Sequence, residues 1–346
     1  MNKINEYIKV LDELGCDCGL VSDRANVRYL SGFSGSAGYL IISKDRRLIV
    51  TDFRYIEQAG EQAKEFEVIN SKNFKFGEYM EQFENVAFED RTISYKGYLR
   101  YEKFCKKLTP IGGAISKIRR YKTPEEIESI RKAASIANDA FFHIIKYIKI
   151  GMTEREIARE LEHYMVTHGA DKISFDTIVA TGAHGSLPHA TPGDKVVADG
   201  DLIVMDYGCK VDGYCSDMTR TVGIGNVDEE SKKAYNTVLK AQLECLDMIK
   251  PGVNCAAVHK HSFNVIDSEY PGLYDHTLGH GVGLEVHEEP GFASAYDIPA
   301  EPGFVLTVEP GVYIPGKCGV RIEDLIVITE NGFDNLCTPP KELIII

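Results

Sequence analysis

Acidic residues interrupt apolar, strand-like stretches at four places in the second half of the chain. Asp206 follows the run LIVM, and Asp217 comes eleven residues later; Glu309 and Glu323 stand in the stretches TVEPGVYI and GVRIEDLIVI. An ionised carboxylate in a half-buried strand is strongly disfavoured unless a positive charge meets it. We therefore expect a cation at these acids.

The first pair of acids has the spacing of a β-hairpin. Asp212-Gly213 is a strong signal for a two-residue turn, which would place residue 208 opposite residue 217. Because side chains alternate between the faces of a strand, Asp206 and Asp217 would then project from one face as diagonal neighbours, roughly 7–8 Å apart at the backbone. Both carboxylates could reach one point, and one of them would be neutralised unless a cation lay between them.

The second pair behaves similarly if residues 315–317, Pro-Gly-Lys, form a three-residue loop. Glu309 then lies directly opposite Glu323, whereas a two-residue loop would send the two acids to opposite faces. We favour the three-residue loop because it alone lets both acids serve one site. A solvated strand face explains any single acid, but it explains four acids paired by register poorly.

Histidines lie between the two hairpins, in the segment DHTLGHGVGLEVHEEPG: His276, His280 and His287. Glycines on both sides of His280 permit close approach of the backbone. A centre with four carboxylates and one imidazole is rich in oxygen, which suits Mn²⁺, Co²⁺, Zn²⁺ or Fe²⁺ better than copper or an iron–sulfur cluster. Four acids suit two divalent ions better than one, about 3.5–4 Å apart. The pattern predicts a dinuclear hydrolase.

Composition bounds the class of protein. The chain has 346 residues, 44% of them hydrophobic, and a net charge of −13; residues 1–120 hold 20 basic and 17 acidic residues, and residues 121–346 hold 19 and 35. An acidic second part disfavours nucleic acid and anionic membranes and favours cations, although part of the excess is ordinary solubilising surface. The absence of a long apolar run and of a signal-like start predicts a cytoplasmic protein. Nine scattered cysteines without a CxxC pair indicate reduced thiols.

Two domains are expected, 1–121 and 122–346. The first alternates helical and strand patterns, with an amphipathic segment at 4–14, the runs YLIIS and RLIVTD, and a helix-like FRYIEQAGEQAKEF. A long helix should open the second domain, because Thr123 can cap it and Glu126 stands three residues later. Thr153 and Glu156 repeat this device before a second helix. Beyond residue 174 the pattern changes to strands and turns, with one further helix at SKKAYNTVLKAQLECLDMI.

On these motifs the chain resembles the pita-bread metallopeptidases: aminopeptidase P, prolidase, methionine aminopeptidase and creatinase. The resemblance implies five metal ligands, carried by DYGCKVDGYCSDMTRT, GHGVGLEVHE, TVEPGVY and GVRIED: Asp206, Asp217, His280, Glu309 and Glu323. The segment NVRYLSGFSGSAGYLIISKDRRLIVTDFRYIEQA resembles the amino-terminal domain of the aminopeptidase P and prolidase branch, which methionine aminopeptidases generally lack. The implied fold class is α/β (α+β), with a creatinase-type domain before a pita-bread catalytic domain.

Further positions match the proline-peptidase pattern. His189 in SLPHATP resembles a histidine that lines the substrate pocket, and His276 and His287 resemble the pair that contacts the scissile peptide and its tetrahedral intermediate. Arg321 matches an arginine of the GVRIED motif and should share the strand face of Glu323. Glu309 would be both a ligand and the proton shuttle, with the three histidines and Arg321 binding or orienting substrate.

The resemblance implies hydrolysis of Xaa-Pro bonds by an enzyme with two divalent ions, Mn²⁺ first and Co²⁺ or Zn²⁺ as alternatives. Prolidase-like members commonly carry an arginine after HEEP, where this chain has Gly291. We therefore expect aminopeptidase P rather than a strict Xaa-Pro dipeptidase (prolidase), with a peptide carrying proline in second position as substrate. Creatinase activity and a metal-free binding module are further alternatives. Family members are often homodimers, so RYLSGFSGS would contribute to a neighbour's pocket.

Overall fold

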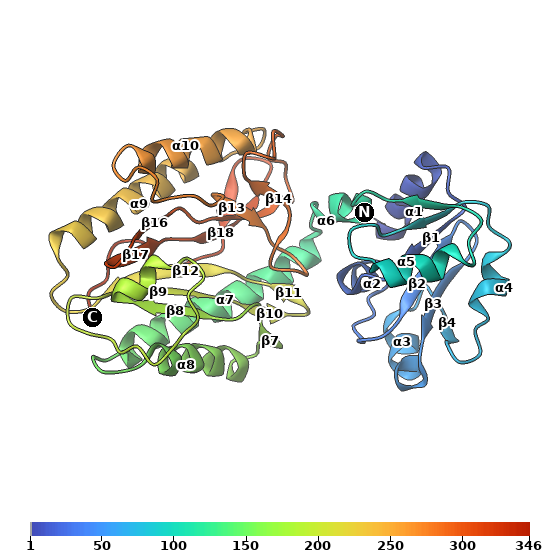
Figure 1. Cartoon of the computed structure of the whole chain (residues 1–346), viewed down its shortest axis with the longest axis horizontal. Helices are drawn as coiled ribbons and strands as arrows, with labels where there is room; N and C mark the ends of the chain where they lie inside the picture. The colour runs from blue at the N-terminus through green and yellow to red at the C-terminus, as the bar shows by residue number, and fades with distance from the viewer. Residues whose placement is uncertain (1) are drawn as a thin grey trace. The chain divides into compact units, whose positions relative to one another are not determined.

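A computed structural model describes residues 2–346 and divides them into two compact units, the first ending at Arg119 and the second running from Arg120 to Ile346. This division lies close to the boundary predicted between residues 121 and 122. Both units mix helices with strands (Figure 1). The expected α/β (α+β) class is confirmed.

The first unit is built on a six-stranded sheet in the order β4-β3-β2-β1-β5-β6. β2 pairs antiparallel with both β1 and β3, and the other pairs are parallel. Its strands are β1 (Cys18–Val21), β2 (Tyr39–Ser43), β3 (Arg47–Thr51), β4 (Glu67–Asn70), β5 (Val86–Phe88) and β6 (Leu108–Pro110). Its helices are α1 (Lys3–Glu13), α2 (Arg24–Ser31), α3 (Ile56–Gln62), α4 (Phe76–Met80), α5 (Tyr95–Glu102) and α6 (Ala114–Arg119), with a 3₁₀ turn η1 (Phe53–Tyr55). The predicted helix at 4–14 and the strand-like runs YLIIS and RLIVTD are confirmed as α1, β2 and β3, although β3 ends at Thr51, one residue before the end of the second run.

Capping residues define the first two helices of the second unit, as predicted. The Thr123 side chain accepts a hydrogen bond from the Glu126 backbone, and the Glu126 carboxylate accepts one from the Thr123 N–H at 2.8 Å. Thr153 and Glu156 form the same reciprocal pair. The helices are α7 (Pro124–Tyr147), α8 (Glu154–Thr167), α9 (Glu229–Met248) and α10 (Cys255–Asp267). α9 covers the predicted SKKAYNTVLKAQLECLDM segment, and α10 is an addition to the prediction.

Two main sheets of the second unit carry the candidate site. One has the order β12-β9-β8 and the other β14-β13-β15-β18-β19; smaller sheets pair β16 with β17 and β11-β10-β7. α7 and α8 lie on one side of these strands and α9 and α10 on the other (Figure 1). The strands are β7 (Lys172–Ile173), β8 (Ile178–Thr181), β9 (Leu202–Tyr207), β10 (Cys209–Val211), β11 (Tyr214–Cys215), β12 (Met218–Gly223), β13 (Gly279–Gly281), β14 (Glu288–Phe292), β15 (Val305–Val308), β16 (Gly311–Ile314), β17 (Cys318–Arg321), β18 (Asp324–Ile328) and β19 (Phe333–Asn335), with a 3₁₀ turn η2 (Gly182–Ser186).

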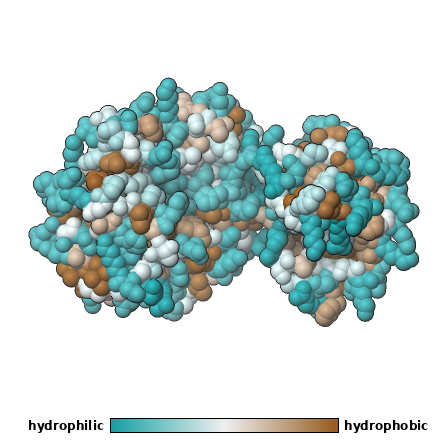
Figure 2. All heavy atoms as spheres, viewed as in Figure 1, coloured by the Kyte–Doolittle hydropathy of each residue, from teal (hydrophilic) through white to brown (hydrophobic). Residues whose placement is uncertain are grey.

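Hydrophilic residues cover most of the face shown in Figure 2, and the apolar ones there form small, separate groups. Within residues 2–346, no helix combines the length and the apolar character that crossing a membrane requires.

Candidate metal centre

The first hairpin has the register that the sequence predicted. Val211 faces Tyr214, so Asp212 and Gly213 form the two-residue turn, and both have positive φ (50° and 80°), as a type I′ turn requires. Tyr207 faces Met218 in the same register, which puts residue 208 opposite residue 217. Residue 208 is a glycine, and a Cβ there would lie 2.0 Å from the Ser216 carbonyl oxygen. Asp206 and Asp217 are therefore diagonal neighbours on one face.

The second hairpin also confirms its predicted register. Ile314 pairs with Cys318, which leaves residues 315–317 as a three-residue loop, and Val308 pairs with Asp324 farther down in the same register. Glu309 and Glu323 therefore face each other between the β15–β18 and β16–β17 ladders. The Glu309 N–H bonds to the Leu278 carbonyl (2.7 Å), so its hydrogen bond leaves the hairpin.

His280 lies on β13, between two glycines that the packing requires. A Cβ at Gly279 would lie 1.9 Å from the Thr307 carbonyl oxygen, and one at Gly281 would lie 2.7 Å from that of Glu288. The Nδ1 atom of His280 is 3.1 Å from the Gly281 carbonyl, an acceptor, so Nδ1 carries the proton of the neutral ring. The Nε2 atom faces the acids, 3.5 Å from Asp217 Oδ2 and 3.3 Å from Glu309 Oε1. A metal-binding histidine is held in this way.

The five side chains predicted as metal ligands come together at one cavity of about 670 Å³. Asp217, His280 and Glu323 each offer a ligand atom, and these three atoms lie within 4.8 Å of one another. The cavity is lined by all five predicted ligands and by four further residues singled out from the sequence, His189, His276, His287 and Arg321. Acids from hairpins and strands up to about a hundred residues apart in sequence thus line the same cavity. The assignment of each acid as a ligand stays a prediction.

The acids of this centre are buried and repel one another, and the chain supplies too little positive charge to balance them. Burial raises the pKa of Asp217 well above its ordinary value, and the Glu323 charge raises it further. Burial and the Glu309 charge raise the pKa of Glu323 in the same way. Glu309 differs, because its interactions with His280, together with the charges of His276 and Arg321, outweigh its burial and lower its pKa to about 2. Without a cation, protons must neutralise part of the centre.

Three oxygen atoms of the centre have no hydrogen-bond partner within residues 2–346, although all three are buried: Asp206 Oδ1, Asp217 Oδ1 and Glu323 Oε1. The second oxygen atom of Glu323 and that of Asp206 each accept a hydrogen bond. Thr219 Oγ1 donates to Glu323 Oε2 (2.7 Å), and Arg321 Nη2 donates to Asp206 Oδ2 (2.5 Å). Buried carboxylate oxygens normally have partners, so this donor set fits divalent cations.

The chain matches the Creatinase/Prolidase N-terminal domain over residues 3–121 and metallopeptidase family M24 over residues 128–330. The chain belongs to metallopeptidase family M24.

Relatives with assigned names support an enzyme of this family. The chain is 37% identical to the Xaa-Pro dipeptidase of Pyrococcus furiosus over 348 residues, which cover 99% of each chain. Among solved structures, the Xaa-Pro dipeptidase from Bacillus anthracis has a TM-score of 0.96 and 40% identity, with 99% of both chains covered. The X-Pro aminopeptidase from Thermotoga maritima has a TM-score of 0.89 and 37% identity, covering 98% of this chain and 100% of that one. The resemblance to the pita-bread metallopeptidases is confirmed, and this M24 protein is a metallopeptidase.

The three further histidines of this M24 enzyme line the cavity in different ways. The His276 Nδ1 atom is 2.8 Å from the Thr277 carbonyl and its Nε2 atom is 3.0 Å from the Tyr313 hydroxyl. The His287 ring is exposed and stands edge-on to His280, with ring centroids 4.3 Å apart. Burial lowers the pKa of His276, and partial enclosure in the cavity, with the charge of His280, lowers that of His287, so both rings are neutral near pH 7. His189 is exposed on the cavity wall. The substrate-binding roles of these rings stay predictions.

Arg321 is more enclosed than the sequence suggested. Its side chain is 4% exposed, and its guanidinium donates to Asp206, to the Tyr313 hydroxyl (2.9 Å) and to the Pro188 carbonyl (3.2 Å). It lines the cavity, as its predicted strand face requires, but its donors hold the wall and a carboxylate of the metal centre. Its role in substrate binding stays a prediction.

Glu154, which the sequence reasoning missed, supports the segment that carries His189. Glu154 is completely buried and accepts hydrogen bonds from Thr181 N (2.9 Å), His184 Nδ1 (2.8 Å) and Gly193 N (3.1 Å). One carboxylate thus bonds to residues 181, 184 and 193, so it fixes the chain on both sides of His189. An acid in the first turn of a helix is ordinarily explained by the helix dipole alone, so the sequence around Glu154 carried no signal of this contact.

Proposed function

We propose that this protein is an Xaa-Pro dipeptidase (prolidase) that depends on two divalent metal ions. The observation that carries the proposal is the convergence of four carboxylates and one imidazole on a cavity that three further histidines line. The chain also matches proteins named Xaa-Pro dipeptidase over nearly its whole length. These relatives support the dipeptidase alternative better than the aminopeptidase P activity that we expected from the sequence.

Five side chains would hold the metal ions: Asp206, Asp217, His280, Glu309 and Glu323. Mn²⁺ is the first candidate, and Co²⁺ or Zn²⁺ are alternatives, because carboxylate oxygens with one imidazole suit these ions. Such ions supply a water molecule of lowered pKa and polarise a carbonyl oxygen.

The chain's own groups would move the protons and orient the peptide. Glu309 is ionised beside His280 and would take a proton from the attacking water and deliver it to the proline nitrogen. His287 is a neutral, exposed ring beside His280, and it can donate one hydrogen bond to the carbonyl oxygen as negative charge develops there. His276 would orient the peptide by accepting a hydrogen bond at Nε2, because its Nδ1 proton points at the Thr277 carbonyl. His189 would form the wall against the proline ring.

One observation favours a second candidate, Xaa-Pro aminopeptidase (aminopeptidase P). A strict dipeptidase must recognise the carboxylate of the second residue, and residue 291 offers no side chain for this. A Cβ at Gly291 would lie 2.6 Å from the Gly279 carbonyl oxygen and 3.1 Å from the Cα atom of His280, so a side chain there would displace β13. Among the described residues that line the cavity, lysine is absent and Arg321 is the one arginine. A dipeptide carboxylate would therefore rely on exposed imidazoles such as His189.

A peptide panel tests the proposal. The metal-free protein, with and without added Mn²⁺, is given Ala-Pro, Ala-Pro-Ala and the control Ala-Ala, and product formation and bound metal are both measured. We expect Mn²⁺-dependent hydrolysis of Ala-Pro, with kcat/KM for Ala-Pro-Ala at least about tenfold lower, since tenfold is a difference of about 1.4 kcal/mol. Faster cleavage of the tripeptide would establish the aminopeptidase instead. Bound metal without hydrolysis of either proline peptide would overturn both candidates. Glu309→Gln, purified identically, controls for contaminating peptidases.

A further inference from the structure

We infer that the buried ion pair between Arg220 and Asp324 positions the metal ligand Glu323 by joining the two sheets that carry the ligands. The inference rests on the metal centre of the proposed function. It concerns the contact between β12 and residues 321–324, called here the seam. The seam joins the sheet of Asp206 and Asp217 to the sheet of the other three ligands.

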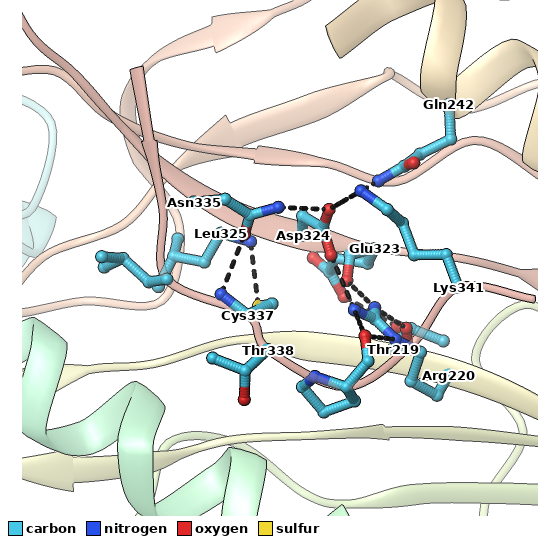
Figure 3. Close-up of polar contacts among 12 residues, drawn as sticks. Thr219, Arg220, Gln242, Glu323, Asp324, Leu325, Asn335, Cys337, Thr338 and Lys341 are labelled. Atoms are coloured by element: carbon cyan, nitrogen blue, oxygen red, sulfur yellow. Dashed lines mark hydrogen bonds and ion pairs between the residues drawn. The ribbon is translucent and has the colours of Figure 1, made fainter.

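One guanidinium bonds to both sides of the seam. Arg220 lies on β12, and its Nη1 atom donates to the carbonyl of its neighbour Thr219 (2.9 Å) and, across the seam, to the carbonyl of Glu323 (2.5 Å). Its Nη2 atom donates to Asp324 Oδ1 at 2.8 Å. Figure 3 shows this fork beside Thr219 and Glu323. Arg220 therefore contacts the backbone of a metal ligand directly.

The side chains of the seam alternate between the cavity and the ion pair. Thr219 and Glu323 meet through a hydrogen bond between Oγ1 and Oε2 (2.7 Å), and the Glu323 N–H donates to the Thr219 carbonyl (3.1 Å). The next residue of each segment, Arg220 and Asp324, makes the ion pair. One residue step separates Asp324 from the ligand Glu323, and one step separates Arg220 from Thr219, which bonds to that ligand. A displacement of the pair is therefore passed to the Glu323 carboxylate through a single backbone unit.

Asp324 has little freedom to move. Besides Arg220 it accepts hydrogen bonds from Gln242 Nε2 (3.0 Å), Asn335 Nδ2 (2.7 Å) and Lys341 Nζ (2.7 Å). These donors come from α9, from β19 and from the C-terminal segment, and Figure 3 shows them converging on the carboxylate. The seam is thus fixed from three directions.

The geometry depends on arginine rather than on positive charge alone. The Arg220 side chain is 1% exposed, and two of its nitrogen atoms also donate to the Pro339 carbonyl, at 2.9 Å from Nη2 and 3.3 Å from Nε. A lysine ammonium would keep the charge but lacks this planar fork. Arg220 and Asp324 are not among the cavity-lining residues that the structure describes, so both are positioning residues.

The test measures Co²⁺ binding, which reports on ligand geometry and not only on fold. Metal-free wild type, Arg220→Lys and Lys341→Met are titrated with Co²⁺, and affinity and visible absorption are recorded at a temperature well below each variant's Tm. We expect Arg220→Lys to bind Co²⁺ at least about tenfold more weakly and with an altered spectrum, since loss of a partner that orients a ligand typically costs 10–100-fold in affinity. Lys341→Met should shift affinity in the same direction by less.

Arg131→Met is the matched control, because it breaks an exposed ion pair with Asp334 (3.2 Å). It should bind Co²⁺ as wild type does. Wild-type affinity and spectrum in both Arg220→Lys and Lys341→Met would overturn the inference even if both lowered Tm, because the pair would then stabilise the fold only. Should Arg220→Lys fail to fold, Lys341→Met decides alone. A wild type that binds no Co²⁺ overturns the proposed metal centre itself, a result distinct from equal binding by wild type and variants.

Discussion

Glu323 and Asp324 are neighbours in the sequence and both are buried, yet their carboxylates lie in opposite surroundings. Burial would raise the pKa of Asp324, but the charges of Arg220 and Lys341 outweigh it and lower that pKa. Burial raises the pKa of Glu323, and the nearby acids, Glu309 above all, raise it further. One cluster receives its cations from the chain, and the other needs them from solution. The difference separates a structural ion pair from a cation site.

The largest effect is expected at Glu309. Glu309→Gln should lower kcat/KM for a Xaa-Pro dipeptide by at least about 10³-fold, because it removes a ligand charge and the proton shuttle together. Bound metal should fall as well, measured by elemental analysis of the dialysed protein. Near wild-type turnover in this variant would remove Glu309 from the mechanism.

Among the residues of the ion-pair cluster formed by Asp324, Arg220 and Lys341, Asp324→Asn should be the most destabilising change. It leaves the buried Arg220 and the partly exposed Lys341 beside an uncharged group, and breaking a buried pair typically costs about 3–5 kcal/mol. Urea unfolding at pH 7 measures this cost. Asp334→Asn, at the exposed Arg131 pair, should cost less than about 1 kcal/mol. Equal losses of unfolding free energy in Asp324→Asn and Asp334→Asn would mean that burial does not strengthen the ion pairs of Asp324.

Glu323→Gln, unlike Asp324→Asn, should stabilise the metal-free protein. A carboxamide removes one of the repelling charges and can donate to the neighbouring acids, so the free energy of unfolding without metal should rise by about 1–3 kcal/mol. In the presence of Mn²⁺ the variant should be less stabilised than wild type, because it binds metal less tightly. Glu330→Gln, at an exposed position beyond β18, is the control. A loss of metal-free stability in Glu323→Gln would show that repulsion does not dominate this centre.

The smallest effect is a pH dependence. Asp217 and Glu323 have raised pKa values in the folded, metal-free protein, so the stability that they contribute is present below about pH 4 and is lost as pH rises through those raised values. His280 also has a raised pKa, because its contacts with Glu309 outweigh burial, and its contribution falls in the same direction. The metal-free Tm should therefore decrease from pH 5 to 8. Glu309, with its pKa of about 2, acts only below this range.

A series of thermal scans in the presence of chelator measures this trend. Mn²⁺ should weaken or reverse it, because a metal displaces protons and binds more tightly as pH rises. A metal-free Tm that rises across the same range would contradict the raised pKa values of Asp217 and Glu323.

Apart from the family resemblance, no local signal distinguished the two adjacent acids of GVRIED, Glu323 and Asp324. Asp324 reaches Arg220 and Lys341, and Glu154 reaches His184 and Gly193, through contacts that depend on how α8, α9 and the C-terminal segment pack. The sequence also did not settle the choice between aminopeptidase and dipeptidase activity. Gly291 favoured the first, and the full-length relatives favour the second.

By itself, the sequence determined both hairpin registers, the capped starts of α7 and α8, and hence which acids share a face. These features are local: the length of a turn fixes the pairing of the strands that it joins, and a cap acts within a single helical turn. Only the tertiary structure decided that the two hairpins and His280 meet at one cavity, which carboxylates obtain a cation from the chain, and which do not. Those outcomes depend on packing between residues up to about a hundred positions apart, for which local spacing carries no information.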